Sequence, residues 1–257
     1  MKSSVSIIGS GNVAEYLASS FFHHEVEVKE ICSRNYITGK DLADTVNATY
    51  VSDIALMSDD VDAIIIAVSD AQIFSVAEML QHKKCIVAHT AGSVEMNVLA
   101  GIAKHGVFYP LQTFTKNLQP TYKDFPFYIE ASDDDSMEKL KYLADKISPN
   151  VFEANSNNRR SLHLAAVFAN NFVNHLLSIA KDIVEHDHLN FSHLVPLIHE
   201  TVYKAHLLSP DQAQTGPARR GDTQSIMKHQ KTLQSNFPQH LEVYSSITQS
   251  ILKKYKS

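Results

Sequence analysis

The stretch VSIIGSGNVAEYL, residues 5–17, decides the fold of this 257-residue chain. A short apolar run ends at Gly9, and a segment with helical spacing begins after Gly11. With Ala14 in the third small position, Gly-x-Gly-x-x-Ala stands between a predicted strand and a predicted helix. The glycines permit a tight turn and a close approach of the backbone to a diphosphate, and the alanine permits close helix–sheet packing. The stretch therefore predicts a dinucleotide-binding βαβ unit.

The alternation of apolar runs and helical segments continues to about residue 151 and predicts an α/β fold. The predicted strands are VSIIG, VEVKEICS, DAIIIAVS, CIVAHTAG, GVFYPLQTF, FPFYIEA and NVFEA. Helical segments separate the first four, as in a doubly wound, mostly parallel Rossmann sheet. Between the last two strands we expect a helix capped by Ser132.

The second part of the chain has a different pattern. Long segments with 3.6-residue spacing predict helices at about 156–188, 190–208, 223–235 and 238–255. We therefore expect two domains: residues 1–155 form a Rossmann-like dinucleotide-binding domain, and residues 156–257 form an all-helical domain.

Composition limits the partners. The chain has 23 Lys and Arg against 28 Asp and Glu, a net charge of -5, and no basic block that would follow a nucleic acid. No apolar run approaches the roughly 20 residues that span a bilayer, and the N-terminus lacks the apolar stretch of a signal peptide. Cys32 and Cys85 lie in separate predicted strands, which favours buried thiols over a disulfide or metal site. We expect a cytoplasmic protein without metal that binds small molecules, and neither nucleic acid nor membrane.

The residues after the second strand indicate which dinucleotide binds. NAD-preferring proteins usually present an acid there to the ribose hydroxyls, but this chain has Ser33, Arg34 and Asn35. Arg34 can pair with a 2′-phosphate and the other two can hydrogen-bond to it. Glu30 lies near the spacing expected for an acid, but we place it inside the strand. NADP is therefore predicted, and NAD is disfavoured.

Further cofactor contacts are expected where the other strands end, because ligands of doubly wound sheets lie at the carboxyl ends of the strands. Val68 and Ser69 end the third strand and should flank the nicotinamide, although Ser69 or Asp70 could equally cap the next helix, and Thr90 follows the fourth strand. The residues expected to bind the cofactor are Gly9, Ser10, Gly11, Asn12, Val13, Ser33, Arg34, Asn35, Val68, Ser69 and Thr90.

Polar residues at the ends of the next strands predict a substrate site. His89 is a candidate general acid because histidine titrates near neutrality. Ser93 either lines the same crevice or caps a following helix. Gln112 either lines the crevice or satisfies edge hydrogen bonds.

The segment HLAAVFANNFVNHL, residues 163–176, carries a second set of polar residues. At 100° per residue, His163, Val167, Asn170 and Asn174 share one helix face. Polar groups on such a face are costly to bury unless they find partners. A cavity with a polar ligand would supply them, as would contacts between helices or subunits.

The stretch TGPARRGD, residues 215–222, interrupts the helices. Arg219 and Arg220 could clamp a carboxylate or phosphate in bidentate fashion. Asp222 could hold one arginine or cap the next helix. The alternative is a solvated loop with a capped helix start.

Taken in order, Gly-x-Gly-x-x-Ala, SRN, AVSD, HTAGS, YPLQTF, HLAAVFANNF and TGPARRGD resemble a family of NADP-dependent oxidoreductases over essentially the whole chain. In that family a Rossmann-like domain precedes an all-helical domain of unassigned function. More distantly, the chain is similar to pyrroline-5-carboxylate reductase, ketopantoate reductase, and the 6-phosphogluconate and β-hydroxyacid dehydrogenases. These relatives imply a homodimer formed through the helical domains and an active site between the two domains.

One departure from the relatives concerns the proton donor. The β-hydroxyacid dehydrogenases carry a catalytic lysine, with an asparagine one turn later, on the corresponding helix. This chain has no lysine between Lys146 and Lys181. Asn170 could replace that asparagine, with His163 or His89 as the proton donor.

The expected function is hydride transfer between NADP(H) and a small anionic carbonyl, imine or alcohol. Asn170 would orient this substrate, and further binding residues are expected to be Ser93, Gln112, Asn174, Arg219 and Arg220. One alternative is a non-catalytic, dimeric NADP-binding sensor, which the missing lysine favours. The other is an enzyme similar to prephenate dehydrogenase, suggested by HTAGS and FYPLQTF.

Overall fold

The computed structural model describes residues 3–255, which divide into two compact units with the boundary between Asn170 and Asn171. The first unit contains the sheet and the first long helix after it, and the second unit is helical. The domain boundary expected at residue 155 precedes that long helix, which belongs to the first unit. Within residues 3–255, no helix has the length and apolar character that crossing a bilayer requires.

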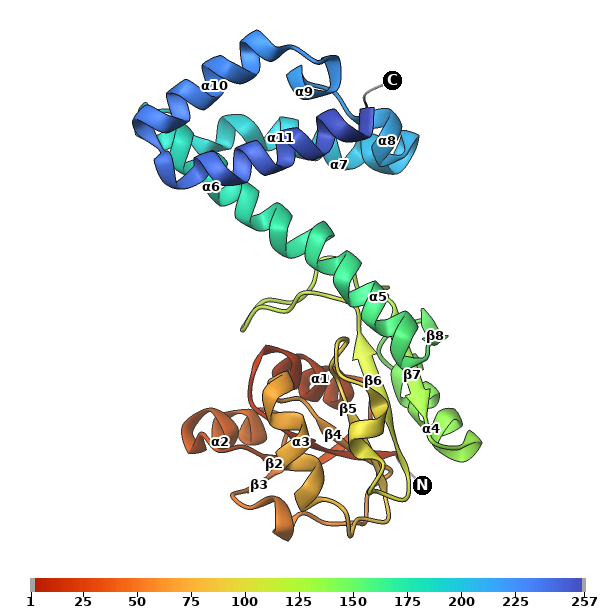
Figure 1. Ribbon diagram of the computed structural model, residues 1–257. Helices are drawn as coiled ribbons and strands as arrows, with labels where there is room; N and C mark the ends of the chain where they lie inside the picture. Colours follow the sequence, from red (N-terminus) through yellow and green to blue (C-terminus); the bar gives the residue numbers. More distant parts are fainter. Residues whose placement is uncertain (1–2, 256–257) are drawn as a thin grey trace. The chain divides into compact units, whose positions relative to one another are not determined.

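The first unit is built on one sheet with the strand order β3-β2-β1-β4-β5-β6-β7-β8 (Figure 1). The strands are β1 (Ser4–Ile8), β2 (Glu27–Cys32), β3 (Thr49–Val51), β4 (Ala63–Ile66), β5 (Ile86–His89), β6 (His105–Pro110), β7 (Phe127–Ala131) and β8 (Val151–Glu153). Only β6 and β7 pair in antiparallel fashion. The doubly wound, mostly parallel sheet is confirmed, and the strand order reverses at β1, where such sheets hold their ligands.

The apolar side chains of the sheet pack into two separate clusters, one on each face of the sheet. Ile7 and Ile65 belong to one cluster, whereas Ile64 and Ile66 belong to the other, as the two-residue period of a strand requires. Helices α1 (Asn12–His23), α2 (Tyr36–Thr45) and α4 (Asp134–Asp145) contribute to the first cluster, and α3 (Asp70–Met79) contributes to the second. The strands are thus covered on both faces, and only their ends remain for a site.

Two local predictions concern caps and cysteines. Asp133, not Ser132, caps α4, because the Asp133 carboxylate accepts from the backbone N–H of Ser136 at 2.9 Å. The predicted cap was wrong by one residue, since two good cap formers are adjacent and only Asp133 lies three residues before that amide. Cys32 and Cys85 are free and buried, as predicted.

The remaining helices follow the predicted segments, except that the short α8 and α9 lie outside them and that one long segment is interrupted. They are α5 (Ser156–Ala166), α6 (Val173–His186), α7 (Val195–Leu208), α8 (Pro210–Ala213), α9 (Pro217–Arg220), α10 (Thr223–Asn236) and α11 (Leu241–Tyr255). Between α5 and α6, Val167–Phe172 form a π-helix, whose i→i+5 hydrogen bonds enclose an extra residue per turn. The uniform 3.6-residue spacing assumed for the polar stripe from His163 to Asn174 is therefore wrong across this segment.

Candidate functional site

A cavity of about 730 Å³ lies in the first unit at the carboxyl ends of β1, β2, β4 and β5. This volume is within the range of small-molecule sites. All residues expected from the sequence to bind the cofactor line it: Gly9, Ser10, Gly11, Asn12, Val13, Ser33, Arg34, Asn35, Val68, Ser69 and Thr90. The fold thus brings together residues as far apart in the sequence as Gly9 and Thr90, and their role as cofactor ligands stays a prediction.

The two glycines of the first loop have different surroundings. A Cβ on Gly9 would overlap the carbonyl oxygen of Ala67, and its φ is +129°, so this position needs glycine for the turn itself. A Cβ on Gly11 would meet nothing within 4 Å. Gly11 is also the N-cap of α1, with no side-chain cap. Its open space and the free N–H groups that begin a helix together form a cradle that fits a diphosphate.

Hydroxyl groups gather on the rim beside Arg34. The Ser10 hydroxyl lies 2.7 Å from the hydroxyls of both Ser33 and Thr38. Arg34 reaches along the rim and donates to the side-chain oxygen of Gln72 at 3.1 Å. The sequence did not indicate Thr38 or Gln72, although Thr38 lies only three residues after the Ser-Arg-Asn segment. One cation and several hydroxyls suit a phosphate group.

Two carboxylates near this rim are already engaged. Glu30 lies within β2, as predicted, and its carboxylate accepts from the backbone N–H of Ser58 at 2.9 Å. Asp53 lines the cavity after β3, a strand absent from the prediction, and accepts from the backbone N–H of Ala55 at 3.0 Å. Neither is the acid that directly follows β2 in NAD-preferring proteins.

The polar residues after β5 lie beside the cavity. Thr90 lines it, and the Ser93 hydroxyl donates to the carboxylate of Asp70, which directly follows the cavity residue Ser69. No α-helix follows Ser93, since the next residues form only the 3-10 turn Met96–Leu99, so its predicted alternative role as a helix cap is wrong. Ser93 remains a predicted substrate ligand.

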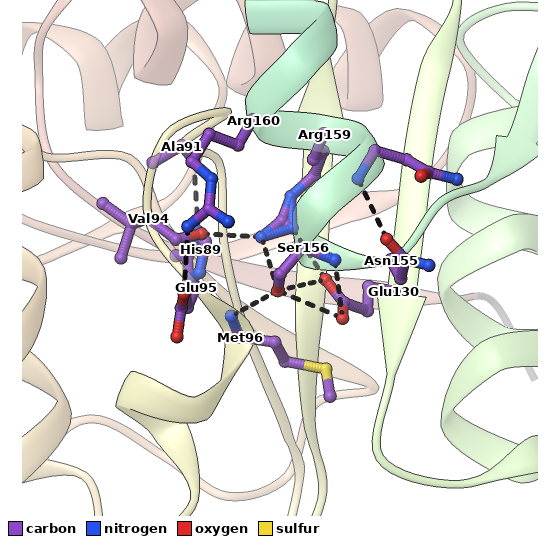
Figure 2. Close-up of polar contacts among 11 residues, drawn as sticks. His89, Ala91, Val94, Glu95, Met96, Glu130, Asn155, Ser156, Arg159 and Arg160 are labelled. Carbon is purple, nitrogen blue, oxygen red and sulfur yellow. Dashed lines mark hydrogen bonds and ion pairs between the residues drawn. The ribbon is translucent and has the colours of Figure 1, made fainter.

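Behind these residues lies a buried ion pair (Figure 2). The Arg159 side chain is completely buried in α5 and donates to Glu130 Oε2 at 2.7 Å and to the Val94 carbonyl at 2.6 Å. Glu130 also accepts from the backbone N–H of Ser156 at 3.0 Å. These contacts fasten the start of α5 to β7 and to the loop after β5, and nothing in the sequence pattern indicated them.

His89 lies at the end of β5 next to this pair and is completely buried (Figure 2). Its Nδ1 accepts from the backbone N–H of Ala91 at 3.2 Å, so the neutral ring carries its proton on Nε2. Burial, together with the positive charge of Arg159, lowers the pKa of His89 to about 4. At neutral pH the ring is therefore uncharged and enclosed, which makes it a weak proton donor.

The lowered pKa of His89 predicts a pH-dependent stability. Between about pH 6.5 and pH 4 the unfolded chain binds a proton that the folded chain does not, so the free energy of unfolding falls as the pH falls through this window. We expect the free energy of unfolding to fall by about 2 kcal/mol between pH 8 and pH 5 because of His89 alone. Urea unfolding measures this free energy at both pH values. Between pH 8 and pH 5, His89→Gln should lose about 2 kcal/mol less of it than the unchanged protein does. Equal losses in both proteins would contradict the prediction.

The other candidate histidine has a different environment. His163, in α5, is partly exposed, and its Nδ1 lies 3.3 Å from the hydroxyl oxygen of Tyr109 in hydrogen-bonding geometry. Tyr109 is the next-to-last residue of β6 and is 8% exposed. Burial raises the pKa of Tyr109 to about 12, so its phenol stays protonated at physiological pH. The sequence pattern indicated only a strand at Tyr109.

The segment after β6 packs against α1. Asn12 donates from its side chain to the carbonyl of Phe114 at 2.8 Å, and the Phe114 and Tyr16 rings stack with centroids 4.4 Å apart. Gln112, a predicted substrate ligand, accepts from the backbone N–H of Thr113 at 2.8 Å. A residue of the phosphate loop and the segment that carries Gln112 are thus directly connected.

The predicted substrate residues of the helical unit lie on its surface. Arg219 is exposed and stacks over the Tyr255 ring at 4.3 Å, and Arg220 and Asn174 are exposed as well. Asp222 caps α10 by accepting from the backbone N–H of Ser225 at 3.0 Å, one of its two predicted roles. Asn170 is exposed in the π-helix at the end of the first unit.

Helix α7 exposes apolar side chains that include Leu197, Val202, Tyr203 and Leu207. A homodimer interface would need such a face, and the homodimer stays a prediction.

In the part of the chain that the structure describes, no three His, Cys, Asp or Glu side chains are grouped as a metal site would need.

Comparisons with known proteins agree with this geometry. Residues 4–92 match the family described as "NADP oxidoreductase coenzyme F420-dependent", and residues 125–251 match a domain of unknown function, DUF2520. The crystal structure of a "putative NADP oxidoreductase" from Bacteroides fragilis is 36% identical, covers 98% of both chains and superposes with a TM-score of 0.91. The chain belongs to this oxidoreductase family. Its resemblance to the family is thereby confirmed, and membership of this NADP oxidoreductase family indicates NADP as the cofactor.

More distant structures share the fold. A protein from Thermotoga maritima is 20% identical, with 98% of this chain and 100% of that chain covered and a TM-score of 0.81. An imine reductase from Myxococcus stipitatus in complex with NADP+ is 12% identical, with 97% and 93% covered and a TM-score of 0.65. No curated protein is significantly similar to this member of the NADP oxidoreductase family.

Proposed function

We propose that the protein is an NADP(H)-dependent oxidoreductase that interconverts a small anionic carbonyl or imine compound and its reduced form. The observation that carries this proposal is the cavity at the strand ends. Both the open glycine cradle at Gly11 and the cationic rim around Arg34 line this cavity. The cradle suits a diphosphate, and the rim suits a further phosphate group. Family membership supports the same cofactor.

The residues of this chain would hold the cofactor by its charged groups. The N–H groups at the start of α1 receive the diphosphate beside Gly11, and Arg34 with the hydroxyls of Ser33 and Thr38 receives the 2′-phosphate. When bound, the cofactor supplies or accepts a hydride. The chain then has to orient the substrate, exclude water and provide the matching proton.

The proposed substrate class follows from the residues beside the cavity. Ser93 and Gln112 offer neutral hydrogen-bonding groups, which suit a carbonyl or imine. An acidic group on the substrate is proposed from the sequence alone, in which Arg219 and Arg220 form an arginine pair of the kind that binds carboxylates. Of the two histidines that the sequence left open, His163 is favoured as the source of the proton, because His89 is enclosed and neutral.

Arg34→Gln tests the cofactor site. Losing a charge-assisted hydrogen bond should weaken NADPH binding by about 10- to 100-fold, with a much smaller effect on NADH, which lacks the 2′-phosphate. Titration of both cofactors by fluorescence or calorimetry measures the two affinities.

Lys40→Gln is the matched control, since Lys40 is a neighbouring cation that pairs with Asp44 in α2 and does not line the cavity. It should leave both affinities within about twofold, as expected for an exposed pair. Equal binding of NADH and NADPH by the unchanged protein would contradict the proposed cofactor, and equal losses for both cofactors in Arg34→Gln would contradict the role of Arg34.

A further inference from the structure

Tyr109 and His163 form a polar pair that the cofactor cavity does not include. Tyr109 comes from β6 and His163 from α5, 54 residues apart, and their Oη and Nδ1 atoms are 3.3 Å apart. Both belong to the first unit. The sequence indicated His163 but gave no sign of a tyrosine beside it.

The pair lies at the same edge of the sheet as the cavity. β5 and β6 are parallel neighbours, so Thr90, which follows β5 and lines the cavity, and Tyr109 near the end of β6 are at corresponding ends. Gly92 lies two residues after Thr90, and a Cβ placed on it would come within 2.6 Å of the Tyr109 ring and 2.9 Å of His163 Nδ1. The loop that borders the cavity therefore packs directly on the hydroxyl–imidazole pair.

Burial keeps the Tyr109 phenol in the neutral form. Asp70 and Arg159 both act on it electrostatically, with opposite sign, and Tyr128 is the third titratable neighbour. Desolvation is the largest effect and opposes ionisation. The phenol therefore keeps its proton at physiological pH, and His163 beside it is partly exposed.

We propose that Tyr109 protonates the substrate and that His163 returns the proton to Tyr109; this inference rests on the proposed reductase function. The reduced nicotinamide supplies the hydride, and the balancing proton leaves Tyr109 Oη as a new O–H or N–H bond forms on the substrate. As the proton on His163 Nδ1 moves to Oη, a proton from solvent adds to Nε2, so the ring stays neutral, and exchange of the ring protons with solvent restores the Nδ1–H form before the next turnover. No lysine is needed, which accounts for its absence from this helix.

The first test needs neither substrate nor cofactor. For the relay, the resting His163 ring has to carry its proton on Nδ1 and donate to Tyr109 Oη. At pH 8, where an ordinary histidine is neutral, ¹⁵N NMR of histidine-labelled protein should show Nδ1 protonated at His163, with the resonance assigned from its loss in His163→Gln. Tyr109→Phe should move the proton toward Nε2. An Nδ1 without a proton in the unchanged protein, or no shift in Tyr109→Phe, overturns the proposal.

The second test measures turnover. NADPH oxidation is followed with pyruvate and other 2-oxo acids and with 1-pyrroline and other cyclic imines as probes. On the best of these, Tyr109→Phe should lower kcat by about 10²- to 10⁴-fold, the usual contribution of general acid catalysis, with NADPH affinity unchanged. His163→Gln should lower kcat less, because water can still reach the phenolate slowly.

Tyr128→Phe is the control for removing a hydroxyl. Tyr128 lies directly opposite Tyr109 in the β6–β7 ladder, and its change should leave kcat and the His163 resonances as they were. Full turnover by Tyr109→Phe would overturn this inference alone. Failure of the unchanged protein to oxidise NADPH with every probe would overturn the proposed function as well.

Discussion

Gly11→Asp is expected to lower the affinity for NADPH by at least about 100-fold, because opposed like charges cost several kcal/mol, while the fold stays intact. The new carboxylate would enter the open space at the start of α1, where nothing lies within 4 Å of an added Cβ. It would therefore occupy and repel the proposed diphosphate without displacing any neighbour. Calorimetric titration with NADPH measures the affinity, and circular dichroism measures the thermal midpoint, which should change by no more than about 2 °C.

Gly9→Ala is the contrasting variant in the same loop. Its methyl group would overlap the carbonyl oxygen of Ala67 at a backbone φ of +129°. We therefore expect a lowered thermal midpoint, because here the fold itself is strained. NADPH affinity retained in Gly11→Asp would show that the diphosphate does not rest on this loop.

The contrast between these glycines shows how far sequence reasoning carries. The Gly-x-Gly-x-x-Ala pattern correctly identified the turn, because strand, turn and helix are contiguous in the chain, and it predicts a dinucleotide as the ligand. Neighbouring strand ends supplied Ser33, Arg34 and Val68 by the same local logic, since parallel strands bring their carboxyl ends to one edge. Among the strands that the structure describes, only β3 was absent from the prediction, because Thr49–Val51 is short and stands between Asn47 and Ser52-Asp53, which are typical of a loop.

Contacts between side chains far apart in the sequence could not be foreseen. The pairing of Tyr109 with His163 depends on how α5 packs near the end of β6, and no periodicity encodes that packing. The π-helix at Val167–Phe172 could likewise not be foreseen, because its sequence of apolar residues and asparagines is compatible with a regular α-helix. Its extra residue per turn altered the face assigned to Asn170 and Asn174, so the positions of residues at the sheet were better predicted than the faces of the helices.

Removing the negative charge of Glu130 should cost about 3–5 kcal/mol of unfolding free energy, because a buried charge is left without its partner. The Arg159 guanidinium has no exposed surface and keeps its charge, although burial lowers its pKa. Glu130→Gln preserves the shape of the side chain but leaves the guanidinium only neutral acceptors, such as the Val94 carbonyl. Urea unfolding followed by circular dichroism measures the loss.

A double-mutant cycle separates this charge effect from packing. Arg159→Met alone should also destabilise, whereas Glu130→Gln combined with Arg159→Met should cost at least about 2 kcal/mol less than the sum of the single changes, since neither charge is then stranded. Lys104→Met is the matched control. Lys104 pairs with Asp135 at the same 2.7 Å, but both side chains are about half exposed, so its loss should cost no more than about 1 kcal/mol. Equal costs for Glu130→Gln and Lys104→Met would mean that the buried pair does not fasten α5 to the sheet.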